Sequence, residues 1–267
     1  MSAEKKSKII GVALAVCIVC SILVSTAAVT LNSIQEQNQK LDRIRNILAA
    51  GNLLDRGKDI QKIYNEYIEA DLIELSTGKV VHPENYTNEL NVSDFDIRTM
   101  ANNPKYSTSI PANEDIAQIK RKPTHMPVYY VREEGELEEI ILPVYGKGLW
   151  STMYGFIALN RDLHTVDGFT FYSHGETPGL GGEVDNPQWK EIWKGKKAFD
   201  ENWNVKIEVI KGRVDPERES AKYQIDGLSG STLTTRGIDN LIKYWLGENG
   251  YGPFFEILRK ELSDDQI

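Results

Sequence analysis

The chain has 267 residues, of which 40% are hydrophobic and 26% are charged, and its formal net charge is -8. This composition is that of a globular protein long enough for one large or two small cores. No basic stripe accompanies the acidic balance, which argues against nucleic acid as a partner.

The N-terminus carries an apolar run without a charged residue, residues 9–31, preceded by lysines in segment 1–8. A bilayer core requires about 20 apolar residues in a helix, so this run is long enough to span a membrane. The alternative is a cleaved signal peptide with a small-residue site at 25–28, but its apolar region would be only about 7–15 residues long. We therefore expect a retained transmembrane helix. Since the lysines abut its N-terminal side, segment 1–8 is expected to be cytoplasmic and the rest external.

The 2 cysteines, Cys17 and Cys20, both lie within this apolar run. As a pair spaced i, i+3 they could contact a partner helix or a buried metal cluster, although small apolar residues of a membrane helix are the more usual case. The rest of the chain can hold neither a disulfide nor a cysteine-ligated cluster. No metal-ligand spacing occurs elsewhere, so no metal site is expected.

Beyond the anchor, heptad-like spacing predicts that the helix continues as a stalk, residues 32–58, before a globular domain, 59–267. An amphipathic helix is expected over 60–68. Residues 84–123 are polar and predict a loop with one short helix. Strands are predicted by alternation and turn signals at 71–81 (two short strands), 128–132 with 137–144 around Gly135, 155–160 with 165–174, and 204–212. A helix over 237–247 ends at Gly247. Hairpins bracketed by helices indicate an α+β fold with an antiparallel sheet.

A glycine-rich segment, "HGETPGLGGEVDNPQW", extends from His174 to Trp189. Its glycines would let the backbone approach a flat ligand or a phosphate, although a purely structural loop is equally compatible with the composition. It is no dinucleotide fingerprint, because Val184 replaces the third glycine and no βαβ unit surrounds it. Glu176 and Glu183 could form an acid/base pair, but an irregular loop fixes no geometry between them. We expect no catalytic residue here.

Two further segments contain candidate binding residues. In "LPVYGKGLWSTMYGF", Lys147 on a glycine turn and Trp150 could face a phosphate or a flat ring, or could be ordinary surface and core residues. In "DGLSGSTLTTRG", residues 226–237, a turn precedes a helix that Thr234 or Thr235 could cap. The alternative is that one of these hydroxyls carries a group.

The segment "DGLSGSTLT" resembles the flavinylation site of membrane ion-pumping flavoprotein subunits, in which Asp-x-x-Ser/Thr-Gly-Ala-Thr receives FMN. The anchor with "VSTAAV", then "LPVYGKGLWSTMYGF", "GETPGLGGEV" and "YWLGENGYGPF", are similar in the same order to the C subunits of sodium-translocating NADH:quinone oxidoreductases. The resemblance covers nearly the whole chain and is least distinctive at 84–123.

The resemblance implies that Thr232 carries FMN through a phosphoester, within a motif that also contains Asp226, Gly227, Ser229, Gly230 and Ser231. Ser231 departs from the family's alanine and places a second hydroxyl beside the acceptor. The residues expected to line the flavin are Glu176, Thr177, Pro178, Gly179, Leu180, Gly181, Lys147 and Trp150. An external flavin transferase would make the bond, because the chain shows no base of its own to activate the hydroxyl.

By the same resemblance, the protein is expected to be an electron-carrier subunit of a six-subunit complex that oxidises NADH, reduces ubiquinone and exports sodium. It would lie in the bacterial inner membrane as a single-pass protein with its FMN-binding domain in the periplasm. Two alternatives remain open. One is the G-type flavin subunit of an Rnf electron-transport complex, and the other is a membrane-anchored binding or structural subunit without a catalytic role.

Overall fold

The structure, a computed structural model, describes residues 3–56 and 59–264. The chain forms two compact units, Met1–Ile44 and Arg45–Ile267. The predicted segment 1–8, stalk 32–58 and domain 59–267 each include residues outside the described ranges. Their bounds therefore stay predictions.

The N-terminal helix α1 (Ala3–Ala50) contains the expected membrane span. Its portion Lys8–Asn32 has a mean hydropathy of 2.7 and none of it is buried inside the protein. Within the described part of the chain, no other helix is long and apolar enough to cross a bilayer. The hydroxyl of Thr30 donates to the carbonyl oxygen of Thr26 at 2.9 Å, which satisfies its polar group inside the helix. By length and composition this portion fits a single-pass anchor.

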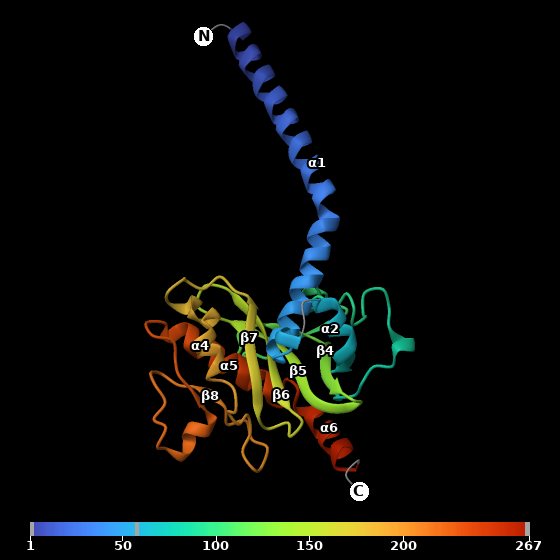
Figure 1. Ribbon diagram of the computed structural model, residues 1–267. Helices are drawn as coiled ribbons and strands as arrows, with labels where there is room; N and C mark the ends of the chain where they lie inside the picture. The colour runs from blue at the N-terminus through green and yellow to red at the C-terminus, as the bar shows by residue number, and fades with distance from the viewer. Residues whose placement is uncertain (1–2, 57–58, 265–267) are drawn as a thin grey trace. The chain divides into compact units, whose positions relative to one another are not determined.

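The second unit is built on a five-stranded antiparallel sheet with the strand order β1-β4-β5-β6-β7, in which β4 to β7 follow one another along the chain (Figure 1). The strands are β1 (Ile68–Glu74), β4 (His125–Glu133), β5 (Glu136–Lys147), β6 (Thr152–Asn160) and β7 (Val166–Ser173). The α-helices that accompany the sheet are α2 (Ile60–Tyr67), α3 (Ile97–Asn102), α4 (Pro187–Glu191), α5 (Thr232–Leu246) and α6 (Gly252–Asp264). Short 3-10 helices are η1 (Leu54–Arg56), η2 (Pro83–Asn85), η3 (Gly181–Asp185) and η4 (Glu219–Tyr223).

The expected α+β class and both predicted hairpins are confirmed, since β4 pairs with β5 and β6 with β7, all antiparallel. The prediction of two strands in 71–81 is wrong for the second strand. Val80 makes only an isolated bridge with Ile73. The chain turns at Gly78 and bonds only briefly to the free edge of β1, because it enters η2 at Pro83, which has no N–H to continue a ladder.

Two small sheets depart from the sequence prediction. The segment expected to be loop contains the strands β2 (Ser107–Ser109) and β3 (Arg121–Pro123), which pair antiparallel. Their ladder is supported by the side chain of Arg121, which donates to the hydroxyls of Ser107 and Ser109. The strand expected within 204–212 is reduced to β8 (Glu208–Val209), which pairs in parallel with β9 (Gln224–Ile225). Such short polar strands leave no alternating pattern to read.

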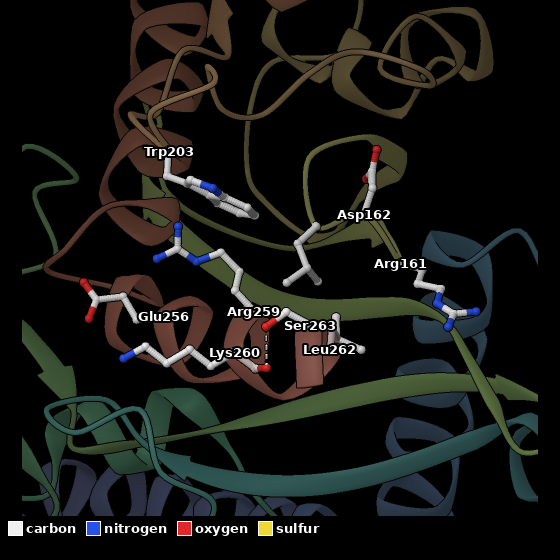
Figure 2. Close-up of a pocket in the computed structure, with 9 residues that line it drawn as sticks. Arg161, Asp162, Trp203, Glu256, Arg259, Lys260, Leu262 and Ser263 are labelled. Carbon is white, nitrogen blue, oxygen red and sulfur yellow. Dashed lines mark hydrogen bonds between the residues drawn. The ribbon is translucent and has the colours of Figure 1, made fainter. Parts of the chain in front are cut away.

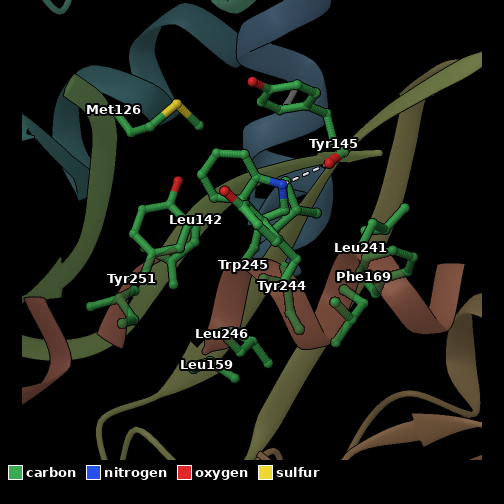
Figure 3. Close-up of a cluster of buried hydrophobic side chains, with 14 of the residues drawn as sticks. Met126, Leu142, Tyr145, Leu159, Phe169, Leu241, Tyr244, Trp245, Leu246 and Tyr251 are labelled. Atoms are coloured by element: carbon green, nitrogen blue, oxygen red, sulfur yellow. Dashed lines mark hydrogen bonds between the residues drawn. The ribbon is translucent and has the colours of Figure 1, made fainter. Parts of the chain in front are cut away.

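One face of the sheet packs against α5 and α6, and Trp245 lies at the centre of this core (Figure 3). Its indole nitrogen donates to the carbonyl oxygen of Tyr145 at 2.6 Å. Tyr251 donates to the carbonyl oxygen of Pro143 at 2.7 Å. Both large aromatic residues thus bury their rings while their polar atoms remain hydrogen-bonded. The bond from Trp245 joins α5 to β5, and the bond from Tyr251 joins the segment after α5 to the same strand.

The other face of the sheet is covered by the segment that follows Ile44. Ile47, Leu48 and Leu53 are each at most 2% exposed. An added Cβ at Gly51 would lie 2.9 Å from the side chain of Ile141, which places the end of α1 directly on β5. The sheet is therefore buried on both faces within the second unit.

Glu139 on β5 is a half-buried acid on the face covered by the end of α1, and its buried Oε2 atom has no hydrogen-bond partner. Burial and the neighbouring negative charge of Asp167 raise the pKa of Glu139 to about 8, while Lys194 and Arg56 act in the opposite direction. Since the folded protein keeps a proton that the unfolded chain loses near its ordinary pKa of 4.5, stability should fall as pH rises from 4.5 to about 8.

We expect Glu139→Gln to remove this slope, which we place on the order of 2–4 kcal/mol across the window. The measurement is urea unfolding of the detergent-solubilised chain at a series of pH values. Glu138→Gln on the same strand, an exposed position, serves as the control. An unchanged slope in Glu139→Gln would assign the pH dependence to another group.

Candidate functional site

Three segments that are far apart in the sequence meet at one carboxylate. They are the loop 148–151 between β5 and β6, the glycine-rich segment 174–181 after β7, and the first turn of α5. The side chain of Glu176, only 5% exposed, lies where they meet. It accepts hydrogen bonds from the backbone N–H groups of Leu149 at 3.2 Å, Trp150 at 3.0 Å and Ser151 at 3.3 Å, and from the hydroxyl of Thr234 at 2.6 Å.

These bonds decide the charge of Glu176. Burial by itself would raise the pKa of this carboxyl, but the hydroxyl of Thr234 and the three N–H groups outweigh burial and hold the pKa below its ordinary value of 4.5. The group is therefore ionised at neutral pH. An anion with four donors fixes the loop 148–151 and the start of α5 in one arrangement.

The segment 226–235 is held by its own polar groups. Asp226 accepts through Oδ1 from the N–H of Val214 at 2.8 Å, and its carbonyl oxygen accepts from the indole of Trp189 at 2.9 Å. A Cβ at Gly227 would lie 2.2 Å from the carbonyl oxygen of Ile210, so only glycine fits there. The first two residues of the proposed motif therefore build the turn and do not project from it.

The turn delivers Thr232 to the surface at the first position of α5. Gly230 adopts φ +72, the left-handed conformation that a glycine accepts readily. Ser231 is the N-cap residue and is 6% exposed, yet its side chain makes no capping hydrogen bond. The first N–H to find a helical partner is that of Thr235, which donates to the carbonyl oxygen of Ser231 at 2.9 Å. The earlier N–H groups of the helix thus remain available to an anion.

The prediction that Thr234 or Thr235 caps the helix is wrong, because the helix begins two positions or more before them. Thr234 instead donates to Glu176. The hydroxyl of Thr235 accepts from the N–H of Leu228 at 3.0 Å and so closes the preceding turn. Thr234 and Thr235 are both buried and their hydroxyls are hydrogen-bonded, whereas Thr232 is exposed.

A cavity of about 670 Å³ adjoins Thr232. This volume lies in the range of pockets that hold small ligands and cofactors. Its lining comes from the start of α5, from the turn 226–230 just before it, and from the segments 183–192 and 211–213. The lining residues that bear on the argument are Trp189, Ile192, Lys211, Arg213, Asp226 and Thr232.

The predicted flavin-lining residues do not all face the same way. The side chain of Lys147 donates to the carbonyl oxygen of Trp150 at 3.1 Å and so braces the loop. Lys147 lines a different cavity, beside Arg98 and Tyr154. By contrast, large apolar side chains project to solvent from each segment held by Glu176. Their exposed fractions are 38% for Leu149, 67% for Trp150, 43% for Leu180 and 53% for Leu233.

The remaining members of the glycine-rich segment form a tight backbone turn. Thr177, Pro178 and Gly179 are exposed, and Gly181 is buried. The carbonyl oxygen of Thr177 accepts from the N–H of Leu180 at 3.1 Å and from that of Gly182 at 2.8 Å. The turn therefore holds Leu180 outward. The exposed hydroxyl of Ser229 lies with Gly230 in the loop before α5.

No acid/base pair is assembled by the two glutamates of this segment. Glu183 accepts a hydrogen bond from the side-chain amide of Asn186 at 2.9 Å. Glu176 accepts the four hydrogen bonds described above, including the one from Thr234. His174 is paired with Asp185 at 2.9 Å. No group of three or more His, Cys, Asp or Glu side chains that could hold a metal occurs in residues 3–56 and 59–264.

A further cavity of about 460 Å³ lies between the β6–β7 turn and α6 (Figure 2). There the guanidinium of Arg259 lies 4.2 Å from the ring centre of Trp203. Arg161 and Asp162 contribute from the turn. Because this turn is at the opposite end of β6 from the loop 148–151, this cavity is separate from the Thr232 site.

Local sequence patterns do not reveal the partners that shape the site. They suggest Thr234 only as a cap, and they do not distinguish Trp189, Lys211 or Arg213 from ordinary residues. Glu176 and Thr234 are separated by 58 residues, so no local spacing connects them.

Comparison with known proteins identifies the class of this domain. Residues 148–247 match the family of FMN-binding domains. This range contains the loop 148–151, Glu176, the cavity and Thr232.

The relatives extend the match to the whole chain. It is 45% identical to the C subunit of the Na(+)-translocating NADH-quinone reductase of Pseudomonas aeruginosa over 96% of this chain and 97% of that protein. It is 40% identical to the C subunit of Vibrio alginolyticus over 94% of each. The crystal structure of Shewanella oneidensis NqrC matches with a TM-score of 0.75 at 34% identity, covering 84% of this chain and 99% of that one. The chain belongs to the family of C subunits of Na(+)-translocating NADH-quinone reductases.

Proposed function

We propose that this chain carries FMN, bound to Thr232 through a phosphoester, and that it relays electrons within a Na+-translocating NADH:ubiquinone oxidoreductase. The observation that carries the proposal is the exposed hydroxyl of Thr232 at the uncapped start of α5, beside a cavity of about 670 Å³. The match of residues 148–247 to FMN-binding domains and the C-subunit relatives support it.

The residues present suit FMN. The free N–H groups at the start of α5 would hold the phosphate, since helix N-termini favour anions by about 0.3–1 kcal/mol at exposed sites. The exposed side chains of Trp150, Leu180 and Leu233 would cover a flat apolar ring. Glu176 would keep the segments that bear them in register. Bound FMN would supply the redox chemistry, while the protein supplies attachment and orientation.

The family context extends this proposal to place and partners. The helix Lys8–Asn32 would anchor the chain in the bacterial inner membrane, with the second unit in the periplasm. The chain would join the other members of a six-subunit complex and would receive its FMN from a flavin transferase. The match to nearly the full length of C-subunit relatives favours this complex over an Rnf complex.

Peptide mass spectrometry on chain co-expressed with a flavin transferase tests the attachment. We expect the mass of FMN on the peptide that contains Thr232, and its absence from Thr232→Ala. Ser231→Ala should remain modified, because the side chain of Ser231 is 6% exposed whereas Thr232 is exposed. FMN on Ser231, or an unmodified peptide despite an active transferase, would contradict the proposal.

A further inference from the structure

The cavity beside Thr232 contains two cations that the attachment chemistry described so far does not use. Lys211 and Arg213 lie on either side of Gly212, in the turn before η4, and both line the cavity with Thr232. Their side chains are exposed. Among the described residues, neither forms an ion pair or a side-chain hydrogen bond.

The two acidic side chains that line the same cavity already accept hydrogen bonds from other groups. Asp226 accepts from the N–H of Val214 at 2.8 Å, and Glu183 accepts from the side chain of Asn186 at 2.9 Å. The turn itself is tied to the motif, because the N–H of Gly227 donates to the carbonyl oxygen of Gly212 at 2.8 Å. Lys211 and Arg213 therefore line the same cavity as the acceptor, and within the described chain neither is paired with a carboxylate that would cancel its charge. In a chain of net charge -8 this is an unusual setting for an exposed hydroxyl.

Attachment of FMN from FAD brings negative charge to this position. The Oγ1 atom of Thr232 attacks the phosphorus atom that bears riboflavin, and an Oγ1–P bond forms. The anhydride bond to the second phosphate breaks, and AMP leaves with the electron pair. The hydroxyl proton goes to a base of the transferase. The product diester carries one negative charge, whereas the departing AMP gains a second on its phosphate, so negative charge builds up beside the acceptor as the anhydride bond breaks.

We propose that Lys211 and Arg213 bind the departing phosphate during this transfer, so that the acceptor protein completes the active site of its own modifying enzyme. The inference rests on the proposed attachment at Thr232. The N–H groups at the start of α5 suffice for the single charge of the finished diester. The two side chains stabilise the extra charge that develops as the anhydride bond breaks and that leaves the site with AMP. Arg213 can engage a phosphate with two N–H groups, and Lys211 acts as a point charge.

The test is the rate of flavinylation of the purified, detergent-solubilised chain by a flavin transferase with FAD. It is followed by flavin fluorescence of the protein band and by mass spectrometry. We expect each of Lys211→Ala and Arg213→Ala to lower kcat about tenfold, and the double variant about 100-fold. Arg213→Lys should recover only part of the lost rate, because lysine keeps the charge but cannot engage the phosphate with two N–H groups. The KM for FAD should change little, because the two cations act mainly in the transition state.

The matched control is the double variant Lys222→Ala, Arg218→Ala. Both residues are exposed, both lie between the turn and the motif, and neither lines the cavity. The control carries the same change in net charge and should be modified at the wild-type rate. Equal losses in control and test variants would assign the effect to overall charge and overturn the inference. A rise in KM alone, or an unchanged rate in the double variant, would also overturn it.

Failure of the inference is separable from failure of the proposed function. If the wild-type chain is not modified at Thr232 by an active transferase, the attachment itself is wrong. If wild type is modified and the cavity variants are modified equally fast, only the role of the two cations is wrong. Thermal melting of each variant checks that the fold is retained, since exposed substitutions usually change stability by no more than about 0.5 kcal/mol.

Discussion

Thr232→Ala should abolish most of the NADH-driven quinone reduction of the assembled complex while leaving the subunit folded and assembled. The variant has a methyl group where the proposed phosphoester forms, so no flavin can be attached. The exposed position at the start of α5 tolerates alanine, because the wild-type side chain is not buried and alanine suits a helix. We expect turnover to fall by more than about tenfold. The measurement is NADH oxidation and quinone reduction by the purified complex, with flavin fluorescence of this subunit's band recorded on the same samples.

Two variants separate the hydroxyl from its surroundings. Thr232→Ser keeps a hydroxyl at the same position and should restore fluorescence and turnover in part or in full. Ser231→Ala removes the neighbouring hydroxyl and should leave both unchanged. Wild-type turnover in a Thr232→Ala complex without fluorescence in this band would show that electrons do not pass through a flavin on this subunit.

Much of the fold follows from local patterns. The alternation in 128–144 with Gly135 between the strands predicts the β4–β5 hairpin, and the structure has it at His125–Glu133 and Glu136–Lys147. The apolar run 9–31 likewise predicts the helix that contains Lys8–Asn32. In both cases the signal is repeated over many residues, so neighbouring positions reinforce one another.

Elements that depend on distant partners were not predictable in the same way. The strands β2 and β3 have three residues each, and their pairing is completed by the side chain of Arg121. The parallel pair β8–β9 joins two-residue strands. Helix α6, with its glycine and proline at the start, was not predicted either. The energy of such elements comes from tertiary packing, so a local window does not contain it.

The candidate site likewise has one part that the sequence predicts and one part that depends on distant partners. The motif at 226–232 is contiguous, so resemblance alone singles out Thr232 as the proposed acceptor. The geometry that makes Thr232 accessible is not contiguous. It depends on Glu176, on the loop 148–151 and on the turn at Gly212, which only the folded chain brings together. The sequence therefore indicates which residue is the proposed attachment point, and the structure indicates how that residue is held.

Glu176→Gln is expected to destabilise the second unit by about 2–4 kcal/mol at pH 7 and to lower its melting temperature by about 5–15 °C. The carboxylate accepts four hydrogen bonds at 2.6–3.3 Å. In the variant, an NH2 group replaces one of the two carboxylate oxygens, so a donor faces other donors. The negative charge that strengthens the remaining hydrogen bonds is also lost. At least one buried N–H or hydroxyl then loses its partner. The measurement is thermal unfolding of the variant and wild type.

The pH dependence of this difference gives a second readout. Burial acts to raise the pKa of Glu176, but hydrogen bonds from Thr234 and from the N–H groups of the loop 148–151 hold this pKa below 4.5. A group with a depressed folded-state pKa stabilises the protein above its unfolded pKa, and this contribution is lost as pH falls through the folded value. The gap between wild type and Glu176→Gln should therefore be full above about pH 5 and shrink below pH 4.5.

The matched control is Glu183→Gln, in the same glycine-rich segment, where the carboxylate accepts from a side-chain amide at its partly exposed site. It should cost less than about 1 kcal/mol, with no narrowing of the gap at low pH. Since the loop 148–151 and the start of α5 are joined through Glu176, its loss should also slow flavin attachment at Thr232. A Glu176→Gln protein that melts like wild type at pH 7 would show that hydrophobic packing of α5 against β5 is sufficient to hold the site together.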